Sequence, residues 1–177
     1  MITIISDDAN QNIGQRIYKE LCSKKIEVEY ISISDADIKP CYSCGGCTYK
    51  TYGKCVVRDD GDKIYPKLIS ADVWLIVTPI MWGTYSYKTK RMVDKLCVIG
   101  DRHYSVVRGE IVKAMQGNIK KLYAVGIKDD CSTEEKSAFS KLVAENINIM
   151  NLSGGSFVVD SDVDDCDILK MAEEISK

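Results

Sequence analysis

Four cysteines gather in one short stretch of this 177-residue chain. The stretch runs from Ile38 to Asp60, IKPCYSCGGCTYKTYGKCVVRDD, and its thiols are those of Cys41, Cys44, Cys47 and Cys55. The first three cysteines recur at every third position, so a short turning backbone can direct their thiols toward one point. Gly45 and Gly46 can adopt the positive φ angles that such a turn needs, and Gly53 marks a second turn before the fourth cysteine.

Converging thiolates support few kinds of chemistry: an iron-sulfur cluster, a zinc ion, or one or two disulfides. Structural zinc sites usually have two separated two-cysteine knuckles, whereas three cysteines with two-residue gaps are typical of a ferredoxin loop around a cubane. Among metals, the spacing therefore favours a [4Fe-4S] cluster, with Cys41, Cys44, Cys47 and Cys55 as ligands. The alternative is free thiols, among which Cys44 and Cys47 form a C-x-x-C pair that could oxidise reversibly.

Composition indicates a single globular domain over residues 1–177, with the cysteine-rich loop at about 38–60. The chain is 45% hydrophobic and 28% charged, and its 24 basic and 26 acidic residues give a formal charge of -2. This balance argues against nucleic acid or a membrane surface as a partner, and the apolar run at 73–77 is too short to span a bilayer. With no secretory pattern in MITIISDDA, the cysteine usage predicts a cytoplasmic protein.

Hydrophobic periodicity predicts alternating strands and helices. The expected strands are 2–6, 26–33, 72–78, 122–127 and 157–160, and the expected helices are 10–23, 62–70, 87–98, 132–147 and 165–176, with a further short helix near 110–115. This alternation predicts an α/β three-layer sandwich, in which helices cover both faces of a five-stranded parallel sheet of order 2-1-3-4-5. Ligands of such folds bind where the strand order reverses, which places residues 6–14 and 78–86 at one crevice.

Two blocks of the sequence resemble the flavodoxin-like family that contains the NAD(P)H-dependent FMN reductases, multimeric flavodoxins and iron-sulfur flavoproteins. They are the cysteine stretch and ISADVWLIVTPIMWGTYSYKTKRMVDKL, and together they extend from about Ile38 to Leu96, a third of the chain. The resemblance implies a flavodoxin-like fold, bound FMN, NAD(P)H as substrate, and a homodimer or homotetramer.

The turn after the third strand resembles the family's Thr-Pro-x-aromatic-Trp-Gly-x-x-Ser turn, whose backbone borders the isoalloxazine ring. Matching positions are Thr78, Pro79, Trp82, Gly83 and Ser86, whereas Met81 replaces the usual aromatic residue. The resemblance implies that this segment contacts the flavin through Thr78, Pro79, Ile80, Met81, Trp82, Gly83, Tyr85 and Ser86. A loop that begins at Gly126 is expected to flank the ring from the other side.

The loop after the first strand departs from the family's phosphate-binding pattern, Ser-Gly-Ser-Pro-Arg followed by Gly-Asn-Thr. Of the matching positions, Ser6 and Asn12 agree, and Asn10 is a further candidate for holding the FMN phosphate with the N–H groups of the first helix. Asp7 and Asp8 stand where the phosphate would lie, and a like-charge contact at about 4 Å costs about 4 kcal/mol at an effective dielectric constant near 20. Alternatively, both carboxylates point away from the site, or Asp8 caps the first helix. Weak FMN binding, a different flavin and loss of the cofactor are therefore three alternatives.

Three functions are consistent with these patterns. The first is an FMN-dependent NAD(P)H oxidoreductase that passes electrons to a quinone, a flavin or another acceptor; because the cofactor performs the chemistry, no catalytic side chain is assigned. The second is an iron-sulfur flavoprotein that relays electrons to small-molecule or protein partners. The third is a flavin-free binding or regulatory module on the same fold.

Overall fold

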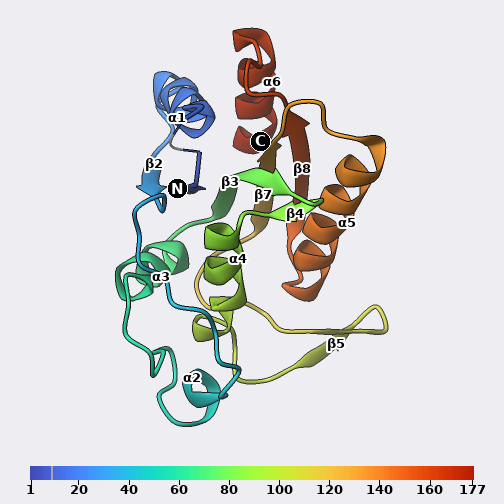
Figure 1. Ribbon diagram of the computed structural model, residues 1–177. Helices are drawn as coiled ribbons and strands as arrows, with labels where there is room; N and C mark the ends of the chain where they lie inside the picture. Colours follow the sequence, from blue (N-terminus) through green and yellow to red (C-terminus); the bar gives the residue numbers. More distant parts are fainter. Residues whose placement is uncertain (9) are drawn as a thin grey trace.

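A parallel five-stranded sheet forms the centre of the molecule (Figure 1). The computed structural model describes residues 1–8 and 10–177. Its strands β2, β1, β3, β7 and β8 lie side by side in that order, which confirms the predicted order 2-1-3-4-5. Their bounds are Ile2–Ser6 for β1, Val28–Ser32 for β2, Val73–Met81 for β3, Lys121–Ile127 for β7 and Ser153–Val159 for β8. The central strands are continuous apolar runs because helices cover both of their faces.

Helices pack on both faces of the sheet and complete the three layers (Figure 1). On one face, α1 (Ile13–Ser23) and α6 (Asp165–Ser176) contribute apolar side chains to one core cluster. On the other face, α3 (Gly61–Ile69), α4 (Tyr87–Asp94) and α5 (Thr133–Ile149) contribute to the second. A capping box starts α5, since the side chains of Ser132 and Glu135 each bond the other residue's backbone. No helix in residues 1–8 and 10–177 is long and apolar enough to cross a membrane.

The structure corrects several expectations about local structure. The strand expected at 157–160 begins at Ser153, and the helix expected at 87–98 ends at Asp94. Two further corrections concern hairpins. The strand expected to end at Thr78 continues to Met81, because residues 80–81 pair with the short antiparallel strand β4 (Thr84–Tyr85). The short helix expected near 110–115 is instead a hairpin of β5 (Ser105–Val107) and β6 (Glu110–Val112). In both hairpins the connecting residues have positive φ angles, which suits the tight two-residue turns that join antiparallel strands.

Candidate functional site

The cysteine loop folds around α2 (Gly46–Tyr49), a single helical turn that contains Cys47. Gly45, at the N-terminus of this turn, has the predicted positive φ of 66°, and Gly53 has a φ of 76°. Gly46 is helical instead, and a Cβ there would lie 2.8 Å from a methyl group of Val56. Gly46 is thus required for close packing within the loop rather than for an unusual backbone angle.

The four predicted ligand cysteines line one cavity of about 370 Å³, which we call the thiol pocket. A fifth cysteine, Cys97, joins them from the 3₁₀ turn η1 (Leu96–Val98), and its Sγ lies 3.7 Å from the Sγ of Cys47. All eight cysteines lie within the described residues and are free thiols. Burial, together with the neighbouring thiols of Cys47 and Cys41, raises the pKa of Cys97 to about 12. Sequence reasoning missed Cys97, which stands outside the motif.

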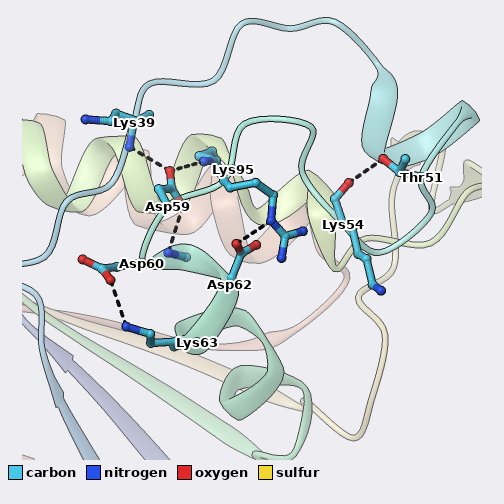
Figure 2. Close-up of polar contacts among 10 residues, drawn as sticks. Lys39, Thr51, Lys54, Asp59, Asp60, Asp62, Lys63 and Lys95 are labelled. Atoms are coloured by element: carbon cyan, nitrogen blue, oxygen red, sulfur yellow. Dashed lines mark hydrogen bonds and ion pairs between the residues drawn. The ribbon is translucent and has the colours of Figure 1, made fainter.

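A buried ion pair fixes the loop to the rest of the fold (Figure 2). Lys95, which directly follows α4, donates from its ammonium group to the carboxylate of Asp59, and both side chains are 1% exposed. The same carboxylate accepts the backbone N–H of Lys39 at 2.8 Å and that of Gly61 at 2.9 Å. Asp59 therefore joins the first residues of the loop to its last residues and to α4.

The spread of the thiols fits an iron-sulfur cluster better than a single zinc ion. Zinc holds each thiolate at about 2.3 Å, so four thiolates around one zinc stand about 3.8 Å apart. Among the described residues, no three of the pocket thiols lie within 4.8 Å of one another. In a [4Fe-4S] cluster each cysteine binds a different iron, so its ligands stand further apart. The donor set of Cys41, Cys44, Cys47 and Cys55 and the cavity volume of about 370 Å³ suit that arrangement.

The second candidate region consists of residues 6–8, 10–14 and 78–86, and we call it the strand-tip crevice after the place where ligands of such folds bind. At its centre the Asp8 side chain lies at the N-terminus of α1 and is 2% exposed. Its carboxylate accepts the backbone N–H of Gly14 at 2.7 Å and the hydroxyl of Ser6. Asn12, at the start of α1, makes no side-chain cap bond and is exposed, as is Asn10. Asp8 therefore bonds groups that were expected to hold the FMN phosphate, and the residues present do not fit that phosphate.

Asp7 occupies the neighbouring part of the crevice. Its carboxylate accepts the hydroxyl of Ser86, which also caps α4 by accepting the N–H of Thr89 at 3.1 Å. Burial raises the pKa of Asp7 above its ordinary value, and the hydrogen bond from Ser86 partly offsets this effect. The hydroxyl of Thr78 accepts the backbone N–H of Ser86 at 3.1 Å. The hydroxyl groups of Thr78 and Ser86 are thus bonded to protein groups.

The expected ring-contacting residues separate into an exposed tip and a buried base. Trp82 and Met81 form the exposed tip, with exposed fractions of 88% and 47%, beside Gly83, which has a φ of 75°. Ile80 and Tyr85 are buried, and the Tyr85 hydroxyl accepts a hydrogen bond from Asn146 on α5 at 2.9 Å.

Two further positions of this set lie in β-strands of the central sheet. Pro79 is half-buried in β3, opposite Ile127 of β7. Gly126 lies beneath Ile80, since a Cβ there would be 2.6 Å from the Ile80 side chain. Gly126 therefore serves close packing of the core.

Helix α4 links the two regions. Ser86 of the crevice caps its N-terminus, whereas Asp94 and Lys95, at its C-terminus, line the thiol pocket. Eight helical residues span about 12 Å. The structure thus holds both candidate sites at opposite ends of one short helix.

The chain is similar in sequence to one family of reductases and to several iron-sulfur flavoproteins. The family model for NADPH-dependent FMN reductases matches residues 6–126. An iron-sulfur flavoprotein of Methanocaldococcus jannaschii is 35% identical over 75 residues, which are 42% of this chain and 38% of that protein. An iron-sulfur flavoprotein of Methanosarcina thermophila is 29% identical over 80 residues, 45% of this chain and 41% of that protein. The matched segments thus span less than half of these two relatives.

Solved structures agree on the fold at low sequence identity. An FMN-dependent NADH-azoreductase of Bacillus anthracis in complex with FMN superposes with a TM-score of 0.60 and 13% identity, over 97% of this chain and 93% of that one. A flavodoxin from the domain Archaea gives a TM-score of 0.53 and 12% identity over the full length of both chains. Because the family model covers well over half of the sequence, this flavodoxin-like chain belongs to the NADPH-dependent FMN reductase family of flavin-linked oxidoreductases.

Proposed function

We propose that this chain is an electron-transfer protein that holds a [4Fe-4S] cluster in the thiol pocket. The observation that supports this function best is the single cavity of about 370 Å³ lined by Cys41, Cys44, Cys47 and Cys55. The curated relatives are named iron-sulfur flavoproteins, which supports the same assignment. When bound, the cluster supplies one-electron chemistry.

The chain's own residues have defined tasks in this proposal. The four cysteines bind the cluster. The pair of Lys95 and Asp59 holds the two ends of the loop together, so that the thiols keep their positions. Cys97 contacts Cys47 but comes from η1, and at 3.7 Å it is too close for the two thiolates to bind different irons. We therefore assign Cys97 as a neighbour of the cluster rather than a ligand.

Iron and sulfide analysis of protein purified without oxygen tests this function. We expect about four iron atoms and about four sulfides per chain. Cys47→Ser should lose most of the iron, whereas Cys97→Ser and Cys22→Ser, the latter altering an exposed cysteine on α1, should retain it. Protein that contains zinc, or no metal after reconstitution with iron and sulfide, would refute the proposal. Loss of iron from Cys97→Ser would instead make Cys97 a ligand.

A second candidate function is an FMN-dependent NAD(P)H oxidoreductase, which passes electrons from the nicotinamide to a small-molecule acceptor. The family match over residues 6–126 and the exposed Trp82 turn support it, whereas Asp8 argues against FMN as the bound flavin. The test is NADH or NADPH oxidation by the purified chain with added flavin and a quinone. Gel filtration with light scattering tests the homodimer or homotetramer that we propose from the family resemblance.

A further inference from the structure

The Asp8 carboxylate makes the contacts that an anion makes at the start of a helix. The first N–H groups of a helix lack partners within the helix and carry partial positive charge, so they attract anions. At α1 the carboxylate of Asp8 accepts the N–H of Gly14 at 2.7 Å and also bonds the hydroxyl of Ser6. Since Asp8 is 2% exposed, this anion belongs to the folded interior. A phosphate at this helix would need the same N–H and hydroxyl groups.

The packing around Asp8 leaves little space for a second anion. A Cβ built on Gly14 would lie 2.7 Å from the Ser6 Oγ and 3.3 Å from Asp8 Oδ1. These atoms are therefore closely packed against the start of α1. A phosphate group is larger than one methyl group, so it could bind here only if the Asp8 side chain moved away.

Further carboxylates lie at the same edge of the sheet. Asp7 lies next to Asp8, and one pocket beyond the ends of β7 and β8 contains four acidic residues and one lysine. These acidic residues are Asp129, Asp130, Asp160 and Asp162.

We propose that Asp8 replaces the phosphate of FMN, so that the crevice selects riboflavin, a flavin without a phosphate group, over FMN. The carboxylate supplies the anion that α1 requires, and the ligand then needs none. This inference rests on the flavin ring as the ligand of the crevice, as in the second candidate function, and is independent of the cluster. Asp8 thus acts as a specificity-determining residue.

Flavin titrations of the full chain test the proposal. Fluorescence quenching of riboflavin and of FMN gives both dissociation constants for the unchanged chain, for Asp8→Ser and for Asp8→Asn. We expect the unchanged chain to bind riboflavin at least tenfold more tightly than FMN. Asp8→Ser should bind FMN at least tenfold more tightly than the unchanged chain does, with inorganic phosphate competing. Asp8→Asn should gain less, since its amide oxygen still accepts the Gly14 N–H while the charge is removed.

Asp162→Ser is the matched control, because it removes one exposed carboxylate from the same sheet edge without touching α1. It should leave the ratio of the two dissociation constants unchanged. Tighter binding of FMN than of riboflavin by the unchanged chain would overturn the proposal. If the unchanged chain binds neither flavin, both this proposal and the second candidate function fail.

Two measurements complete the test. If Asp8→Ser does not fold, the nearly isosteric Asp8→Asn decides the test, because it should bind FMN more tightly than the unchanged chain does. Iron analysis of the same preparations tests the cluster proposal separately from this one. If the cluster proposal fails, the protein contains little iron, whatever the ratio of its dissociation constants for riboflavin and FMN.

Discussion

The thiol pocket and the strand-tip crevice differ in what their reactive groups bond. In the thiol pocket the cysteines are free thiols around a cavity, and the charged groups nearby, Lys95 and Asp59, bond each other. In the crevice the hydroxyls of Ser6 and Ser86 bond the carboxylates of Asp8 and Asp7. A sequence motif thus indicates where a site lies, but the hydrogen-bond partners of its polar groups decide which ligand it can accept.

The largest effect that distinguishes the two regions should come from Lys95→Ala. Removal of one partner from a buried pair leaves an uncompensated charge, so we expect the free energy of unfolding in urea to fall by about 3–5 kcal/mol. The iron content should fall with it, because Asp59 would no longer hold the loop to α4.

Lys90→Ala is the control, because it breaks an exposed i,i+4 pair with Asp94 on the same helix and should cost about 0.3–0.5 kcal/mol. The double variant Asp59→Asn with Lys95→Met should recover part of the lost stability, since neither charge remains buried and the amide oxygen at position 59 can still accept a backbone N–H. A cost below about 1 kcal/mol for Lys95→Ala would contradict the role of the pair.

Gly126→Ala should have an intermediate effect, on the crevice side. The new methyl group would lie 2.6 Å from the Ile80 side chain and 2.8 Å from Phe139, so overpacking should cost about 1–3 kcal/mol in urea unfolding. Gly155→Ala, in the adjacent strand, is the control because its Cβ meets no atom within 4 Å. If Ile80→Val does not relieve the cost of Gly126→Ala, the close packing described here is not its cause.

Asp7→Asn should have the smallest effect, and its sign depends on pH. Because burial raises the folded-state pKa of Asp7, ionisation opposes folding, and stability falls as pH rises from 3.8 through that folded pKa. At pH 7 we therefore expect Asp7→Asn to raise the free energy of unfolding by a few tenths of a kcal/mol, after allowance for solvent screening. The difference should vanish near pH 3.

Asp129→Asn provides a control of opposite sign for Asp7→Asn. Hydrogen bonds from the backbone and hydroxyl of Ser161 lower the pKa of Asp129, so its ionised form favours folding. Its replacement should lower the melting temperature at pH 7, with a difference that disappears below the folded pKa. Equal signs for the two variants would contradict the assigned causes.

The sequence predicts the sheet well because local patterns determine it. The apolar runs of β1 and β3 and the capping box at Ser132 are local signals, and the sheet order follows from their alternation. The two hairpins were missed, although Trp82-Gly83 and Arg108-Gly109 are residue pairs of the kind that tight turns use. Short strands next to such pairs are easily mistaken for loops or helices.

The parts of the sites that depend on distant residues could not be predicted from the sequence. Cys97 contacts Cys47 across 50 positions, and Lys95 meets Asp59 across 36. No spacing rule connects such pairs, because tertiary packing alone brings them together. Asp8 is an intermediate case: its type and place suggested that it could cap the first helix, which its bond to the Gly14 N–H confirms, but not that it would also bond Ser6.

The two ends of the cysteine loop are hydrogen-bonded to each other, which indicates that the loop tolerates changes of its length and sequence. Two hydrogen bonds join Asp37 to Asp60. The backbone N–H of Asp37 donates to the Asp60 carboxylate at 2.9 Å, and the backbone N–H of Asp60 donates to the Asp37 carbonyl at 3.2 Å. Since the ends of the loop are fixed beside each other, a change of its length costs little closure entropy, about 0.6 kcal/mol for each doubling. Insertions at the exposed turn near Gly53, which keep Ile38 and Asp59 in place, should therefore leave the sheet and its register intact.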